Sequence, residues 1–178
     1  MSSITSSFEK LSQRSLRKTI ILIFATVGSS KTPFDRLVKA VDGLASIISE
    51  QVIVQLGASN YQPRAASYFK YCDSEKIASF IKEANIVISH AGFGIIADCI
   101  RMNKRLILIP REQRFGDAEG NQVELAEYLA KNSDGIICIR DVNKLQAALI
   151  QVQNTTPCYQ FTNKIPEMVQ SFIDRRLG

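Results

Sequence analysis

Two glycine-containing turns in the sequence have residue types that suit phosphate binding. One lies at Thr26–Ser30 (TVGSS) and the other at Gly92–Gly94 (GFG), and each follows a short apolar run. Glycine lets a backbone turn sharply and approach a ligand closely, and the N–H groups at the start of a following helix can hold an anion. The residues we expect to contact a phosphate are Gly28, Ser29, Ser30, Gly92, Phe93 and Gly94. An ordinary strand-to-helix turn would also explain either segment alone.

The only histidine of the chain, His90, lies directly before the second turn, at the end of the apolar run Ile86–Ser89. A lone histidine is more often a structural residue than a catalyst, but this position at a strand end favours a functional role. Asp98 follows in the next helix, away from its apolar stripe. A carboxylate there can accept two hydrogen bonds from a ribose diol, although a solvated acid on a helix face is the alternative.

A third segment, Pro110–Gln122, follows another apolar run and is rich in polar residues. Arg111 and Arg114 are candidate cations in it, and Lys31 is a third beside the first turn. Gln122 falls in the first turn of the expected next helix, where its side-chain amide can bond a hydroxyl or a phosphate. A charged loop is usually only solvated, so composition alone does not assign this segment a function.

The elements that must position these residues alternate between short apolar runs and longer amphipathic ones. This alternation predicts an α/β fold with a doubly wound parallel sheet, in which ligands bind beyond the carboxyl ends of the strands. All three segments lie at such ends. The expected strands are Thr19–Ala25, Gln51–Leu56, Ile86–Ser89, Leu106–Ile109 and Gly135–Ile139, with a short extended piece at Ser67–Tyr71. The expected helices begin near Pro33, at Ser74 (the predicted cap), Ile95, Asn121, Val142 and Ile165, and end at Ile48, Glu83, Met102, Lys131, Gln153 and Arg176.

Length and composition limit the classes of function. The chain has 178 residues and a net charge of +5, which predicts one domain over residues 19–178 after a flexible basic segment at 1–18. No block of lysine and arginine is interleaved with aromatic residues, so we expect no nucleic-acid partner. The four cysteines are scattered and one histidine is present, which favours free thiols in a reducing cytosol and no metal site. No stretch is long and apolar enough to span a membrane.

Three segments, taken together, resemble the C-terminal domain of the family 28 glycosyltransferases. They are FATVGSSKTPFDRLVKAV, VISHAGFGIIADCI and LILIPR with GNQVELAEYLA, in the family's order and spacing over roughly Ile20 to Lys131. The similarity is greatest to split members of the family, whose small subunit carries only the donor-binding half of a two-domain GT-B enzyme. These subunits act in dolichol-linked oligosaccharide or bacterial exopolysaccharide synthesis.

The resemblance implies a function and a set of partners. It implies an inverting transfer of a sugar from a UDP-sugar to a lipid-linked acceptor, without a metal or other cofactor. The acceptor half would come from a membrane-anchored partner subunit, and the chain would be cytoplasmic and reach the membrane only through that partner. The predicted C-terminal helix, whose apolar face includes Ile165 and Phe172, would dock on the partner or pack on its own domain.

The resemblance also assigns residues. Gly28, Ser29 and Ser30 match the turn that contacts the diphosphate, and His90, Gly92 and Gly94 match the second turn. Gln122 matches a glutamine that contacts the donor sugar or phosphate, and Asp98 falls where the family usually has a ribose-binding glutamate. Lys31, Arg111 and Arg114 would be supplementary cations. His90 would be a donor-site residue first and a general base second. Phe93 and Ile95 replace smaller or hydroxyl residues of the family, and Asn121 replaces a histidine.

Two other functions remain open at this point. Gly92–Ala97 fits the pattern G-x-G-x-x-A of a nicotinamide-binding domain, with Arg111 placed for a 2′-phosphate. That pattern normally follows the first strand, whereas here it lies in the middle of the chain and leaves Gly28 and Gln122 without a role. The other alternative is a non-catalytic subunit that enhances a paired transferase, which the departures at Phe93, Ile95 and Asp98 favour.

Overall fold

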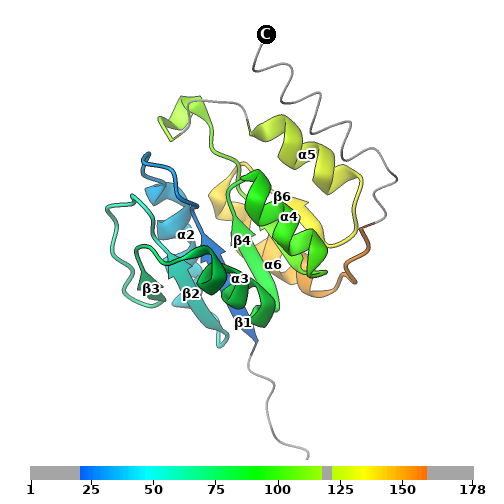
Figure 1. The fold of residues 1–178 in the computed structure, drawn as a ribbon, viewed down its shortest axis with the longest axis horizontal. Coiled ribbons are helices and arrows are strands. Elements are labelled where there is room, and N and C mark those ends of the chain that lie inside the picture. The colour runs from blue at the N-terminus through cyan, green and yellow to red at the C-terminus, as the bar shows by residue number, and fades with distance from the viewer. Residues whose placement is uncertain (1–20, 118–121, 160–178) are drawn as a thin grey trace, which may run out of the picture.

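Parallel strands form a single sheet with helices on both faces (Figure 1). The computed structural model describes residues 21–117 and 122–159. Within these residues the sheet has six strands in the order β3-β2-β1-β4-β5-β6, all parallel. This is the doubly wound order of dinucleotide-binding folds, and it confirms the predicted fold class. The strands are β1 (Leu22–Thr26), β2 (Gln51–Gln55), β3 (Ser67–Phe69), β4 (Ile86–Ser89), β5 (Arg105–Leu108) and β6 (Ile136–Cys138).

Two hydrophobic clusters, one on each face of the sheet, hold the helices in place. Helices α2 (Asp35–Ala45) and α6 (Leu145–Gln153) contribute to one cluster, and α3 (Ser74–Glu83), α4 (Phe93–Arg101) and α5 (Val123–Lys131) to the other. The alternation along β1 shows the division, because Ile23 and Ala25 belong to the first cluster and Phe24 to the second. Two short 3-10 helices, η1 (Gln113–Phe115) and η2 (Val142–Lys144), complete the described elements.

Several boundaries differ from the sequence prediction for local reasons. Asp73, not Ser74, caps α3, because its carboxylate accepts a hydrogen bond from the Lys76 amide at 2.7 Å. Helix α4 begins two residues before Ile95, since Gly92 is extended and its carbonyl already accepts from the Ile96 amide. Helix α2 ends at Ala45 instead of Ile48, and the predicted helix from Val142 divides into η2 and α6.

The structure also tests predictions about Gln122, the cysteines and membrane spans. Gln122 is the residue before α5 and not part of its first turn. The segment 1–18, the expected helix from Ile165 to Arg176 and Asn121 lie outside the described residues. All four cysteines are free, with Cys99 buried and Cys138 half-buried. In the part of the chain that the structure describes, no helix is long and apolar enough to cross a membrane.

A buried carboxylate of α2 organises the loop between β2 and β3. Asp42 accepts hydrogen bonds from the Tyr61 hydroxyl at 2.7 Å and from the backbone amides of Arg64, Ala65 and Ala66 at 2.8–3.0 Å. Burial raises the pKa of Asp42, but these hydrogen bonds outweigh it and lower the pKa to about 2. The loop is therefore fixed to α2.

The order of the strands creates one place where two chain turns meet. The strands β1 and β4 are neighbours although they are not consecutive, and Thr26 at the end of β1 pairs in register with Ser89 at the end of β4. The crossover from β1 runs toward β2, whereas the crossover from β4 runs toward β5, so the loops leave this point in opposite directions. Open α/β sheets bind ligands at such a switch point.

Candidate functional site

The imidazole of His90 lies between the two predicted glycine turns at the switch point. A Cβ atom added to Gly28 would fall 2.4 Å from His90 Cε1, and one added to Gly92 would fall 2.2 Å from His90 Nε2. Gly28 also has a φ of +76°, which a residue with a side chain rarely adopts. Both positions therefore require glycine while His90 is in place. The structure brings together three residues that the sequence singled out separately.

Hydrogen bonds from the ends of two strands, β1 and β2, hold the first turn. The Thr26 hydroxyl donates to Gln55 Oε1 and accepts from the Gly28 amide at 3.1 Å. Gln55 Nε2 in turn donates to the Gly28 carbonyl at 3.3 Å. Gly57 has a φ of +53°, and a Cβ there would lie 2.8 Å from the same carbonyl. Gln55 and Gly57 were not predicted, and the available signal was a polar residue near the end of an apolar run, two residues before a glycine.

Among the described residues, several backbone amides of the two turns have no hydrogen-bond acceptor. Ser29, Ser30 and Lys31 are exposed, and within residues 21–117 and 122–159 no acceptor is recorded for their amides. The Ser30 hydroxyl accepts from the Thr32 amide at 3.1 Å. Helix α4 has no side-chain cap at Gly92, and its second residue, Gly94, has open space around the position of a Cβ. An uncapped helix start carries a partial positive charge, so both turns offer donors to an anion.

His90 is neutral at pH 7. Burial and the positive charge of Arg111 lower its pKa to about 4, against a smaller opposing effect of a hydrogen bond to the Thr26 backbone. The Ser89 hydroxyl lies 3.3 Å from His90 Nδ1. A neutral imidazole offers one N–H donor and one lone pair, and a pKa this low makes it a weak base.

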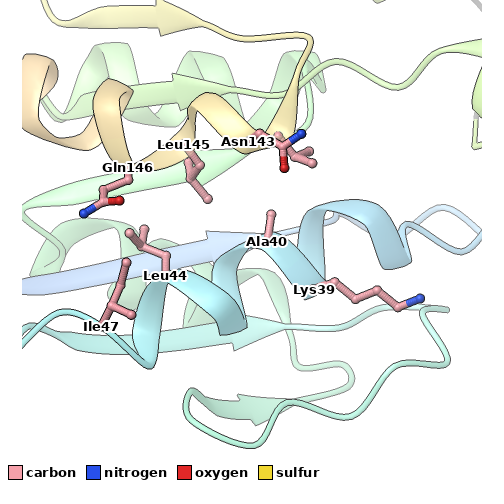
Figure 2. Close-up of a pocket in the computed structure, with 8 residues that line it drawn as sticks. Lys39, Ala40, Leu44, Ile47, Asn143, Leu145 and Gln146 are labelled. Atoms are coloured by element: carbon pink, nitrogen blue, oxygen red, sulfur yellow. The ribbon is translucent and has the colours of Figure 1, made fainter.

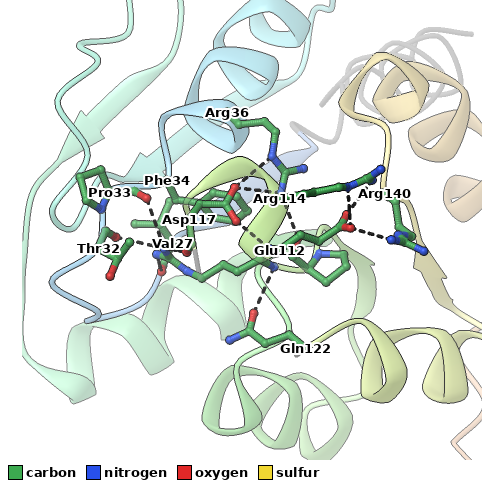
Figure 3. Close-up of polar contacts among 12 residues, drawn as sticks. Val27, Thr32, Pro33, Phe34, Arg36, Glu112, Arg114, Asp117, Gln122 and Arg140 are labelled. Atoms are coloured by element: carbon green, nitrogen blue, oxygen red, sulfur yellow. Dashed lines mark hydrogen bonds and ion pairs between the residues drawn. The ribbon is translucent and has the colours of Figure 1, made fainter. Parts of the chain in front are cut away.

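The guanidinium of Arg111 is enclosed by protein acceptors, and Figure 3 labels the residues that supply them, Val27, Thr32, Pro33 and Asp117. Its Nη2 donates to the Val27 carbonyl at 3.0 Å, and its Nη1 donates to the carbonyls of Thr32, Pro33 and Asp117 at 2.8–3.3 Å. The side chain also lies over the Phe34 ring, 4.6 Å from its centre. Only 3% of the residue is exposed. Arg111 therefore does not present its charge on the open side of the turns, as direct contact with a ligand would require.

The remaining residues of the third segment form a network of ion pairs. Gln122 Oε1 accepts from the Arg111 amide at 3.2 Å, which places this side chain beside the loop that follows β5. Arg36 of α2 pairs with Asp117 at 3.0 Å. Glu112 is buried between the more exposed Arg114 and Arg140, at 2.9 and 2.6 Å. Hydrogen bonds from Arg140 hold the pKa of Glu112 below its usual value.

Two further predicted residues lie on α4. The carboxylate of Asp98 forms an ion pair with Arg101 at the helix surface. Phe93, at the first position of the helix, is half exposed. Their roles toward a ligand stay predictions. Among the described residues, no three side chains of His, Cys, Asp or Glu gather in the manner of metal ligands.

A surface groove lies between α2 and α6, away from the glycine turns (Figure 2). It has a volume of about 360 Å³ and is lined mainly by apolar residues with a few polar ends. The lining residues are Lys39, Ala40, Leu44, Ile47, Val142, Asn143, Leu145 and Gln146. None of the predicted site residues belongs to it, so the groove is not the candidate site.

Known proteins resemble this chain in sequence. Residues 22–171 match the family described as glycosyltransferase family 28 C-terminal domain. The UDP-N-acetylglucosamine transferase subunit ALG13 of Homo sapiens is 32% identical over 129 residues, which cover 65% of this chain and 11% of the human protein. The subunit of the same name from Debaryomyces hansenii is 41% identical over 58 residues, 33% of this chain and 26% of that protein. The chain thus spans only a minor part of these two relatives.

Solved structures resemble this chain in fold. The calicheamicin glycosyltransferase CalG4 superposes with a TM-score of 0.57 at 13% identity, covering 79% of this chain and 36% of that enzyme. MurG of Acinetobacter baumannii gives a TM-score of 0.51 at 15% identity, covering 83% of this chain and 46% of MurG. At these identities the likeness concerns the fold alone. It is the fold of one part of a larger chain.

Proposed function

The chain belongs to the glycosyltransferase family 28 C-terminal domain family, and from this we propose that it is the donor-binding subunit of a UDP-sugar transferase. The observation that carries the proposal is the arrangement at the switch point. His90 fills the space between Gly28 and Gly92, so the amide-bearing turns after β1 and β4 lie side by side. A diphosphate is the anionic group with two charged centres that two adjacent turns would hold.

The proposed chemistry is transfer with inversion at the anomeric carbon. As the bond to the sugar breaks, negative charge grows on the leaving UDP. The amides of Ser29, Ser30 and Lys31, together with the start of α4, would stabilise that charge, and we invoke no metal. Gln122 would contact the donor sugar or a phosphate, and Asp98 the ribose. Arg114 would be a supplementary cation for the leaving diphosphate.

His90 serves the donor in this proposal and does not activate the acceptor. Its neutral imidazole donates or accepts a hydrogen bond at the junction of the turns, and with a pKa of about 4 it draws a proton from a hydroxyl only weakly at pH 7. We therefore assign the general base to the acceptor-binding half of the complex.

The relatives guide the choice of donor and partner. Because their names give UDP-N-acetylglucosamine and the word subunit, UDP-N-acetylglucosamine is the first donor to test. We propose that a membrane-anchored subunit supplies the acceptor half and that the acceptor is lipid-linked. This chain would then be cytoplasmic and reach the membrane through that subunit.

Ligand binding tests the proposal. UDP and UDP-N-acetylglucosamine should raise the thermal unfolding midpoint of the chain, alone or with its partner, and NADPH should not. A midpoint raised by NADPH and not by UDP would instead indicate a nicotinamide-binding domain. No response to either ligand in the assembled complex would indicate a non-catalytic enhancer subunit.

A charge placed in the second turn separates binding from folding. Gly94 is exposed and has room for a side chain, so Gly94→Asp should fold normally, and a carboxylate at a helix start is itself stabilising. The same carboxylate would repel a diphosphate, so UDP binding should be lost while the unfolding midpoint without ligand is kept. Gly94→Asn is the uncharged control and should retain most of the binding.

A further inference from the structure

Arg111 contacts both ends of the first glycine turn. Its Nη2 donates to the Val27 carbonyl, just before Gly28, and its Nη1 donates to the Thr32 and Pro33 carbonyls, just after Lys31. One rigid, planar group therefore connects the two ends of residues 28–31, which we call the phosphate arch. The connection reaches across about eighty residues of sequence, since Arg111 lies in the loop after β5.

These contacts decide which backbone groups the phosphate arch presents. Carbonyl oxygens repel phosphate, and those of Val27, Thr32 and Pro33 are directed to the guanidinium. The first amide of the arch and the amides after it are also engaged, because Gly28 donates to Thr26 Oγ1, Thr32 to Ser30 Oγ and Phe34 to Ser59 Oγ. The amides that remain are those of Ser29, Ser30 and Lys31, on the exposed side of the arch.

The charge of Arg111 is not matched by a carboxylate of its own. The Asp117 carboxylate bonds Arg36 and the Glu112 amide and acts on Arg111 only through its charge, whereas the hydrogen bond from Arg111 goes to the Asp117 backbone carbonyl. Arg111 Nε is buried without a hydrogen-bond partner. Burying a cation among carbonyl groups is costly for folding, and an apolar side chain of similar length would avoid that cost. Its positive charge remains available to attract an anion on the other side of the arch.

We propose that Arg111 is a positioning residue that fixes the phosphate arch in its anion-binding shape and supplies positive charge behind it, without touching the ligand. This inference rests on the proposed function. It differs from direct contact because the guanidinium would stay enclosed when the diphosphate is bound. Its effect is exerted through the amides of Ser29, Ser30 and Lys31.

Three variants of the chain test the inference. They are prepared without a histidine tag, and together with the partner subunit if UDP binding requires it. Arg111→Lys keeps the positive charge, but its single ammonium cannot reach both ends of the arch. Arg111→Met removes the charge and the hydrogen bonds to the arch. Arg105→Met is the matched control, because Arg105 donates to the Thr155 carbonyl at 2.9 Å at the opposite end of β5. The measurements are the UDP dissociation constant by calorimetry and the titration of His90, the single histidine, by NMR.

His90 reports the charge separately from the shape of the arch. The groups that face it are Arg111, the Ser89 hydroxyl and the Thr26 backbone, and the nearby charge of Arg111 lowers its pKa. The His90 pKa should stay near 4 in Arg111→Lys and rise in Arg111→Met, but stay below the ordinary 6.5, because burial is the larger cause of the shift and remains in both variants. A purely structural role for Arg111 would not produce this difference between two folded variants.

The UDP dissociation constants of the variants then test whether Arg111 fixes the arch. We expect the UDP dissociation constant to rise about tenfold in Arg111→Lys and about a hundredfold in Arg111→Met, as for loss of hydrogen bonds to a charged group. Arg105→Met should match the original chain. If Arg111→Met does not fold, the UDP dissociation constant of Arg111→Lys alone tests the inference. Binding of UDP by folded Arg111 variants within twofold of the original chain refutes the inference and leaves the proposed function intact. Absence of UDP binding in the original complex refutes both.

Discussion

Replacing Gly92 with alanine tests the contact between His90 and the second turn directly. The added Cβ would fall 2.2 Å from His90 Nε2 and 2.7 Å from Cε1, about 1 Å short of an ordinary van der Waals contact. The backbone itself allows alanine, because Gly92 has a φ of −80° and a ψ of 126°. The whole cost beyond helix capping must therefore come from moving the imidazole out of its place between the turns.

The size of the effect follows from two contributions. Forcing one extra carbon into a filled space costs roughly 1–3 kcal/mol. Alanine is also a poorer N-cap than glycine, which adds up to about 1 kcal/mol. We expect Gly92→Ala to lower the free energy of unfolding by about 2–3 kcal/mol in urea titrations. Gly43→Ala is the matched control, because Gly43 lies within α2 with nothing near its Cβ position, and it should raise stability by about 0.5–1 kcal/mol.

A double-mutant cycle identifies the cause. In a chain that already carries His90→Ala the imidazole is absent, so Gly92→Ala should cost only the capping contribution, about 1 kcal/mol or less. The coupling energy between the two sites should therefore exceed about 1 kcal/mol. Equal costs of Gly92→Ala with and without His90 would refute the packing of this ring between the turns.

Three other variants extend the test. Gly28→Ala should lower the free energy of unfolding more than Gly92→Ala does, because the φ of +76° at Gly28 adds about 1–2 kcal/mol of backbone strain. Removing the imidazole by His90→Ala cannot relieve that strain, so urea titrations in which His90→Ala abolished the whole cost of Gly28→Ala would contradict this expectation. Gly57→Ala should destabilise by about 2 kcal/mol regardless of His90, since its Cβ would meet the Gly28 carbonyl; dependence on His90 would be the contrary result. Asp42 has a folded pKa of about 2 against an ordinary 3.8, so its stabilisation is fully present above about pH 4 and is lost as the pH falls through 2. The difference in unfolding free energy between the original chain and Asp42→Asn should thus shrink by about 2 kcal/mol between pH 6 and pH 2, and a constant difference would argue against the shift.

The sheet could be predicted because its signal is local. Runs such as Ile86–Ser89 are apolar on both faces, and their spacing leaves room for one crossover between successive strands. The turns at Gly28 and Gly92 were predicted for the same reason, since a glycine three residues after the end of such a run is visible in the sequence. Parallel strands then place both turns at one edge, without any knowledge of side-chain contacts.

The contacts inside the site could not be predicted, because they join distant segments. Arg111 is a charged loop residue by composition, and only the fold shows that it is enclosed by carbonyls from the turn after β1. The role of Gln55 could not be predicted for the same reason, since its partners Thr26 and Gly28 lie on β1 and in the turn that follows β1. The prediction of Ser74 as the cap of α3, where the structure has Asp73, was a local error, made because both residues can cap a helix.

The two edges of the sheet carry its shortest strands. β3 and β6 have three residues each, whereas the inner strands have four or five. A short edge offers few unpaired amides and carbonyls to another molecule, and this limits association between sheet edges. Beside β6, Cys158 forms an antiparallel bridge with Asp134, and Pro157 lies against Gly135. The residues that follow α6 thereby cover the approach to this edge, so shortening the chain before them would make aggregation more favourable even with every strand and both glycine turns retained.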